Sequence, residues 1–168
     1  MPNYKNTLSP VTLSPIGVIH SPHTRGKRTP IQPVYAEGIK GTVKVFPEYA
    51  EGLRDIEGFS HIYLIYHFHR AEPIRLIVKP YLEDVFHGVF ATRTPHRPNP
   101  IGFSVVRLTK REDNILYVED VDILDGTPLL DIKPYISRFD HRENVRNGWQ
   151  EHIDEDLARL RGSRKYEG

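Results

Sequence analysis

The stretch SHIYLIYHF, residues 60–68, decides the fold, because it has the clearest strand character in the chain. β-Branched and aromatic residues dominate it, and these residue types are enriched in strands. Side chains alternate across a strand, so every second residue from Ile62 to Phe68 is expected on one face. The histidines of this region, with Tyr63 and Ile65, then lie on the other face. The apolar face predicts a sheet that packs on a core.

Seven further short segments also have strand character, through alternation or through apolar runs. Turn residues separate them, which is typical of a barrel or sandwich rather than of a parallel sheet with long intervening helices. The sequence contains no GxGxxG motif after a strand and no P-loop. The predicted strands are 13–20, 39–46, 86–92, 102–109, 115–119, 120–124 and 129–132.

Two segments predict helices. Proline suits the first turn of a helix, so residues 47–58 are expected to form a short one. A second is expected at 152–162, with Asp154 or Asp156 near its start. The expected organisation is a flexible segment at 1–12, one domain at 13–140, and a tail at 141–168 that holds the short C-terminal helix.

Composition bounds the function. At 168 residues the chain is long enough for one domain with a core, and its net charge of +1 means that any basic patch must be local. It has no cysteine, which excludes a disulfide framework, a thiol nucleophile and a zinc site with cysteine ligands. No apolar run has the length of a membrane span, and we find no signal-peptide pattern. We therefore expect a cytoplasmic protein without a membrane partner.

The loop FATRTPHRPNPIG, residues 90–102, is the first candidate site. Each proline fixes its own φ and restricts the residue before it, so the loop is expected to be extended and pre-organised for a ligand. Arg93 and Arg97 offer planar donor forks that suit a carboxylate or a phosphate. Asn99 offers a donor and an acceptor, which suits the edge of a base. The alternative interpretation is a rigid surface connector.

The segment ILDGTPLLDIKPY, residues 123–135, is the second candidate. Asp122, Asp125 and Asp131 bracket a predicted turn at DGTP, in which glycine supplies the unusual dihedral. Their carboxylates can accept from ribose hydroxyls or from an amine. They can equally cap their own backbone, as aspartates in turns often do.

The segment HFHR, residues 67–70, is the third candidate. His67 and His69 share a strand face, with Glu72 close behind, and a pair of histidines on a barrel strand can hold a transition metal. Such pairs are also found as hydrogen-bonded structural residues. No nucleophile elbow supports Ser-His-Asp catalysis.

Taken together, four long segments resemble one family, the TsaA/TrmO family, which includes YaeB and VirR-like proteins. The motifs of this family are close to RSPxRPNPIGxS and DGTPxxDIKPY. Thr94 stands where many members have Ser, and the resemblance runs from about residue 16 to residue 140. The segments are PIQP at 30–33, EGLRDIEGFSHIYLIYHFHR at 51–70, FATRTPHRPNPIGFSVVRL at 90–108 and DILDGTPLLDIKPY at 122–135.

The resemblance implies a mainly β protein: a compact single-domain β-barrel of short, mostly antiparallel strands with long functional loops and few helices. It implies an S-adenosylmethionine-dependent methyltransferase that acts on N6 of threonylcarbamoyladenosine at position 37 of tRNA, next to the anticodon. It also implies a homodimer that contacts the tRNA anticodon stem-loop, without a metal.

The resemblance also implies particular site residues. His69, His96 and Asp125 are candidates for the proton acceptor, and neither the family motifs nor the sequence chooses among them. The residues expected to contact nucleic acid are Arg25, Lys27, Arg28, Arg97 and Lys133. The expected cofactor residues are Pro30, Ile31, Gln32, His69, Arg70, Arg93, Phe103, Asp122, Leu124, Asp125, Gly126 and Thr127.

Two other functions remain open from the sequence. One is a metal-dependent barrel enzyme that uses His67, His69 and Glu72. The other is a module that binds S-adenosylmethionine without transferring its methyl group. The basic cluster at 25–28 can likewise be a solvated loop.

Overall fold

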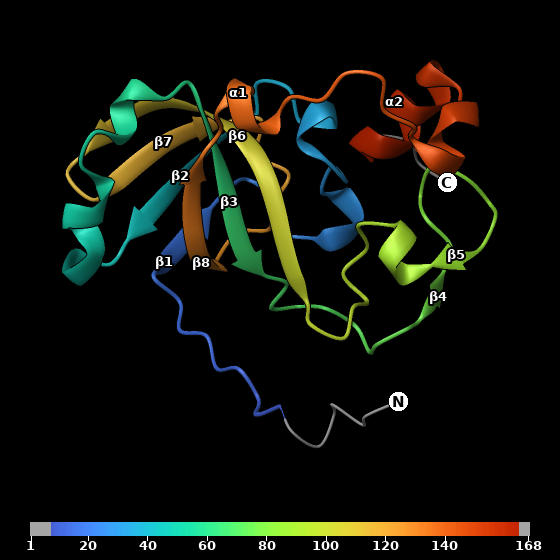
Figure 1. The fold of residues 1–168 in the computed structure, drawn as a ribbon, viewed down its shortest axis with the longest axis horizontal. Helices are drawn as coiled ribbons and strands as arrows, with labels where there is room; N and C mark the ends of the chain where they lie inside the picture. Colours follow the sequence, from blue (N-terminus) through green and yellow to red (C-terminus); the bar gives the residue numbers. More distant parts are fainter. Residues whose placement is uncertain (1–7, 165–168) are drawn as a thin grey trace.

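Six antiparallel strands close into a barrel in the computed structural model, which describes residues 8–164 (Figure 1). The strand order around the barrel is β1-β2-β7-β6-β3-β8. This confirms the prediction of a mainly β barrel with mostly antiparallel strands. The strands are β1 Gly17–His20, β2 Lys40–Val45, β3 His61–His67, β6 Ile101–Glu112, β7 Ile115–Glu119 and β8 Thr127–Pro134.

The strand β3 lies between β6 and β8 and supplies the predicted apolar face. Ile62 is paired with Val106 of β6 on one side and with Pro134 of β8 on the other. Ile62 and Leu64 are fully buried, whereas His67 is exposed. The core therefore lies inside the barrel. Its other members are Ile19, Val43, Val45, Leu53, Tyr66, Val106, Leu116, Val118, Val121, Ile123 and Leu129.

Helices are short and lie outside the barrel. The segment expected to form one helix at 47–58 forms two 3-10 helices, η4 Pro47–Leu53 and η5 Ile56–Gly58. The expected C-terminal helix is present as α2 Glu155–Ser163, and Asp154 caps it by accepting from the Leu157 amide at 2.9 Å. The other helices are η2 Gly26–Arg28, η3 Pro33–Tyr35, η6 Val89–Ala91, α1 Ser137–Asp140 and η7 Gly148–His152.

Two predicted strands are wrong. Of residues 86–92, only His87–Gly88 forms a strand, β5, which pairs with β4 Ile77–Val78 in a separate two-stranded sheet. The chain then turns into η6, where Thr92 donates to the Val89 carbonyl at 2.9 Å. Residues 120–124 form no strand either, because the positive φ of Asp120 (68°) ends β7.

The segment beyond β8 crosses to the side of the barrel that faces the β4–β5 sheet (Figure 1). There, η7 and α2 contact the loops that precede β2 and β6. Residues 8–12 are exposed and without regular structure, and the rest of the segment predicted to be flexible lies outside the described residues. None of the helices within residues 8–164 has the length and apolar character needed to cross a membrane.

Candidate functional site

Two loops meet at Arg93, beside the barrel end formed by β3 and β6. One Arg93 guanidinium nitrogen donates to the side-chain oxygen of Gln32 at 2.7 Å. The guanidinium carbon lies 4.8 Å from the centre of the Phe103 ring, which is a cation–π geometry. Gln32 lies in the 21–38 loop and Phe103 in β6. Three residues predicted separately therefore form one cluster, in which Phe103 is 43% exposed.

A buried polar chain lies inside the barrel next to this cluster. Ser104 donates to an Asp122 carboxylate oxygen at 2.6 Å, and the Tyr66 hydroxyl lies 3.1 Å from the Ser104 hydroxyl. Burial raises the pKa of Asp122 to about 7, and the Ser104 hydrogen bond and the Arg93 charge oppose this shift only in part. Burial likewise raises the pKa of Tyr66. Asp122 is thus a carboxyl group that can change charge near neutral pH.

The DGTP turn is fixed by the segment that follows β1. Gly126 has a positive φ of 74°, as the sequence predicted for this turn. Asp125 accepts from His20 Nδ1 at 3.1 Å and from the Ser21 amide at 3.2 Å. Burial would raise the pKa of Asp125, but these hydrogen bonds outweigh burial and lower it. Asp125 is therefore a carboxylate at neutral pH.

His69 lies against the same turn. Its Nδ1 is 3.4 Å from the Thr127 hydroxyl, and this hydroxyl donates its only proton to the Leu124 carbonyl at 2.7 Å. Toward His69 the hydroxyl can then only accept, so Nδ1 carries a proton and Nε2 holds the lone pair in the neutral ring. Burial, followed by the charges of Arg70 and His67, lowers the pKa of His69 and favours this neutral form.

The proline-rich loop uses some of its predicted site residues internally. Arg97 donates to the carbonyls of Val89 at 3.1 Å and Thr92 at 2.8 Å. His96 Nδ1 lies 3.3 Å from the Pro73 carbonyl. The structure thus places Arg97 as a support of the loop that carries Arg93, and within residues 8–164 no hydrogen bond joins the His96 side chain to His69 or Asp125.

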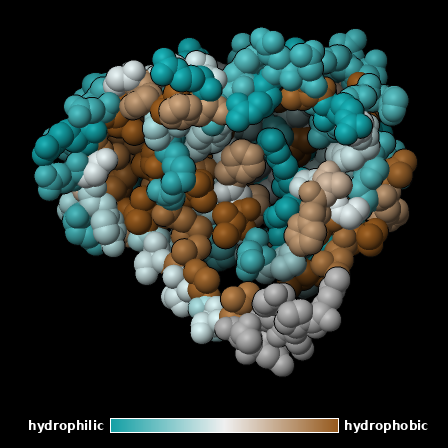
Figure 2. Space-filling view, in the orientation of Figure 1, coloured by the Kyte–Doolittle hydropathy of each residue, from teal (hydrophilic) through white to brown (hydrophobic). Residues whose placement is uncertain are grey.

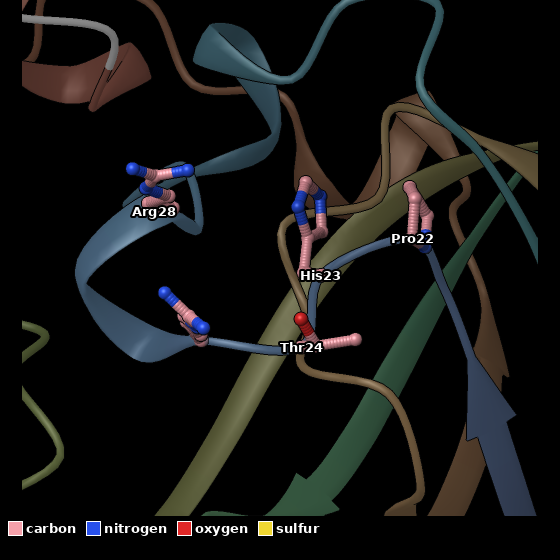
Figure 3. A pocket seen from close by; sticks show the side chains of 5 residues that line it. Pro22, His23, Thr24 and Arg28 are labelled. Atoms are coloured by element: carbon pink, nitrogen blue, oxygen red, sulfur yellow. The ribbon is translucent and has the colours of Figure 1, made fainter.

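The basic cluster lies on the loop that joins β1 to η3. Arg25, Lys27 and Arg28 are exposed there, and Pro22, His23, Thr24, Arg25 and Arg28 line a hollow of about 380 Å³. Figure 3 shows Arg28 and His23 on opposite arms of this loop. Arg70 donates to the Thr24 carbonyl at 3.3 Å, so the hollow adjoins the HFHR segment. Lys133 lies apart on β8, in an ion pair with Asp131 at 2.9 Å.

The histidines of HFHR do not gather metal ligands. Within the part of the chain that the structure describes, no three His, Asp or Glu side chains lie close enough together to hold a metal ion. Glu72 pairs instead with Arg75, at 3.6 Å. The geometry therefore does not favour the interpretation based on His67, His69 and Glu72.

Several residues that shape the site were not predicted from the sequence. The pattern around Ser104 does indicate it, because Ser104 is a polar residue at an inward position of a strand whose neighbours on that face are apolar. No sequence pattern indicates His20, Ser21 or His23. They hold the 121–125 segment through contacts that are about a hundred residues apart in sequence.

The fold and the site define a small antiparallel barrel with a cluster of polar side chains, drawn from three loops, at one end. The family model described as the tRNA-methyltransferase O N-terminal domain matches residues 18–141. The chain therefore belongs to this family, as its resemblance to TsaA/TrmO proteins indicated.

Individual relatives agree with this assignment. The chain is 61% identical over 152 residues to a probable S-adenosyl-L-methionine-binding protein of Pyrococcus abyssi, covering 90% of this chain and 83% of the relative. It is 35% identical to the human tRNA (adenine(37)-N6)-methyltransferase, covering 78% of this chain and 31% of that protein. The crystal structure of TrmO from Pseudomonas aeruginosa superimposes with a TM-score of 0.71 at 40% identity, covering 84% of this chain and 63% of that one. Several relatives are therefore much longer than this chain.

Proposed function

We propose that this chain is an S-adenosylmethionine-dependent methyltransferase that acts on N6 of adenosine 37 in tRNA, with threonylcarbamoyladenosine as the substrate nucleoside. The names of its relatives support the cofactor and the reaction class. The observation that carries the proposal is the convergence of Gln32, Arg93 and Phe103, because a cation, an amide and an exposed ring lie within one cluster there.

The residues present fit the cofactor. Arg93 suits its carboxylate, because a guanidinium binds a carboxylate through two parallel hydrogen bonds. Phe103 and Leu124 suit the adenine ring, and the acidic side chains of Asp122 and Asp125 suit its amine and ribose hydroxyls. Pro30, Ile31, Arg70, Gly126 and Thr127 are the further proposed cofactor contacts. When bound, the cofactor supplies a methyl group that its sulfonium charge has already activated.

We infer that His69 is the proton acceptor. The substrate N6 forms the new bond to the methyl carbon, the bond from this carbon to sulfur breaks, and a neutral thioether leaves. The N6 proton must then go to a base. The chain from Nδ1 through Thr127 to the Leu124 carbonyl leaves Nε2 of His69 unprotonated beside two proposed cofactor residues, whereas Nδ1 of His96 lies 3.3 Å from the Pro73 carbonyl and Asp125 is hydrogen-bonded to His20.

Arg25, Lys27 and Arg28 are proposed to contact tRNA phosphates, because they project from an exposed loop that adjoins the site. Lys133, which is paired with Asp131, is a further proposed phosphate contact. Arg97 is instead assigned to holding its own loop, because it is bonded to Val89 and Thr92.

A homodimer is also proposed. The segment around the β4–β5 sheet exposes Ile74, Leu76, Ile77, Val85, Phe86 and Phe90. Figure 2 shows apolar surface beside this sheet as well as over the barrel. Large exposed apolar patches mark interaction surfaces.

The test is methyl transfer to tRNA. The purified protein is incubated with S-adenosylmethionine and with tRNA that carries unmethylated threonylcarbamoyladenosine at position 37. The tRNA is then digested, and the masses of the released nucleosides are measured by mass spectrometry. The wild type is expected to add one methyl group to that nucleoside. His69→Gln is expected to lower kcat about 100-fold, while His141→Gln, an exposed control, leaves kcat unchanged. Cofactor binding without transfer to any tRNA would instead favour a non-catalytic module.

A further inference from the structure

The C-terminal tail contacts the two loops that meet at Gln32 and Arg93. In Figure 1, α2 lies beside the barrel, near both the β4–β5 sheet and the short helices that precede β2. These loops are far apart in sequence, and their strands do not neighbour each other in the barrel. The relative position of the two loops therefore depends on the segments that pack against both of them.

The end of α2 holds the first loop. The Ile31 amide donates to the Gly162 carbonyl at 2.9 Å, and the Arg164 guanidinium donates to the Gly26 carbonyl at 2.9 Å. The two bonds are made at the two ends of the segment 26–31. This segment contains Pro30 and leads directly into Gln32. A carbonyl at a helix C-terminus lacks an intrahelical donor, so it is free to accept from a loop amide.

The same tail holds the second loop. Arg161 donates to Asp84 at 3.2 Å, and the Arg164 guanidinium lies 3.6 Å from the centre of the Tyr81 ring. Trp149 donates through Nε1 to the Ala91 carbonyl at 2.9 Å, and its ring stacks on His87 with centroids 4.9 Å apart. Ala91 is two residues before Arg93.

Gly162 sets how closely the tail approaches. A Cβ atom at this position would lie 2.4 Å from Cδ2 and 2.6 Å from Cγ of the Tyr35 ring. Real Cβ atoms essentially never approach another atom within 3.0 Å, so an alanine here would force the Tyr35 ring or the helix to shift. The present close approach of the helix to the Tyr35 ring therefore requires glycine at this position.

We propose that the tail, residues 148–164, is a positioning brace that holds the 26–32 loop and the 81–93 loop in register, so that Gln32 and Arg93 meet with the geometry that the cofactor needs. Only the expected effect of the tail on cofactor affinity rests on the proposed function. The ordering of the loops themselves is a separate, measurable property.

The experiment compares Gly162→Ala with Gly52→Ala, a control position where an added Cβ meets nothing within 4 Å. Trp149→Phe is the second variant, because phenylalanine keeps a ring over His87 but has no donor for Ala91. Amide hydrogen exchange at Ile31 reports the ordering of the loop, and calorimetric titration reports the affinity for S-adenosylmethionine. Exchange within β3 and β6 reports whether the barrel stays folded.

The expected result is faster exchange at Ile31 and a roughly five- to tenfold weaker cofactor affinity in Gly162→Ala, as the loss of one hydrogen bond predicts. Trp149→Phe should weaken cofactor affinity by a similar factor, and Gly52→Ala should change neither property. Unchanged Ile31 exchange in Gly162→Ala would overturn the brace. Faster exchange with unchanged affinity would overturn its role at the cofactor site. If the wild type bound no cofactor, the proposed function would fail, while the exchange at Ile31 would still decide the brace.

Discussion

The buried carboxyl group of Asp122 has a measurable cost. Raising its pKa from 3.8 to about 7 corresponds to a penalty on the charged form of about 4 kcal/mol. A carboxyl group with a raised pKa in the folded state stabilises the protein below its unfolded pKa, and this contribution is lost as the pH rises through the folded pKa. Between about pH 4 and pH 7, Asp122 should therefore lower the free energy of unfolding as the pH increases.

The substitution Asp122→Asn removes this dependence and keeps the shape of the side chain. The asparagine oxygen can still accept from Ser104, but its buried amide group costs about 1–2 kcal/mol. The variant should then be about 2–3 kcal/mol more stable than the wild type at pH 8, and equal or less stable near pH 4. Under the proposed function it should also bind S-adenosylmethionine more weakly.

The assay is urea denaturation followed by circular dichroism at pH 4, 5, 6, 7 and 8. The difference between the two proteins isolates Asp122, because the other titrating groups are common to both. If the two stability profiles stayed parallel across this range, or if the variant were less stable at pH 8, the charge of Asp122 would carry no such penalty and the reasoning would be refuted.

Three further predictions concern the core, the loop and the basic cluster. Gly102→Ala would place a Cβ 2.4 Å from the Tyr66 ring and should cost about 1–3 kcal/mol in the free energy of unfolding, measured by denaturation. Arg97→Ala should weaken cofactor affinity without changing the salt dependence of tRNA binding, because Arg97 is bonded to Val89 and Thr92; a flatter salt dependence would show a phosphate contact instead. The triple substitution of Arg25, Lys27 and Arg28 by Ala should reduce the slope of log K against log salt for tRNA binding by about 2–3, and an unchanged slope would mean that this loop contacts no phosphates.

The strand and core pattern was largely readable from the sequence. The inward positions of β3 follow directly from the alternation of Ile62, Leu64 and Tyr66, and β7 matches its predicted bounds. Both features depend on local periodicity, because a barrel strand buries one face and the apolar residues therefore alternate along its sequence.

The two wrongly predicted strands, 86–92 and 120–124, show what a local apolar pattern does not predict. Residues 121–123 are buried, as their apolar character suggested, but their backbone groups bond to loops. The Val121 amide donates to Ile39, and the Ile123 carbonyl accepts from Ser21. Apolar runs report burial, whereas a strand also needs a neighbouring ladder. In the 86–92 segment, Phe86 and Phe90 are exposed, and the apolar pattern carried no sign of this.

The sequence predicted which segments form the candidate site but not which of their residues contact one another. Arg93 and Asp122 stood out through the chemistry of their loops, and Phe103 through the resemblance to a known family. That Arg93 meets Gln32, and that Thr127 sets the tautomer of His69, depends on how loops distant in sequence pack together.

The most direct measurement is calorimetric titration of S-adenosylmethionine into the wild type, Arg93→Ala and Arg107→Ala, with and without tRNA. Arg107 is a control of the same residue type, because it is exposed on β6 and pairs with Glu119 and Asp120 rather than with Gln32 or Phe103. We expect the wild type and Arg107→Ala to bind the cofactor equally and Arg93→Ala to lose at least about tenfold in affinity. Equal binding by all three proteins, or no binding by the wild type even with tRNA present, would contradict this expectation.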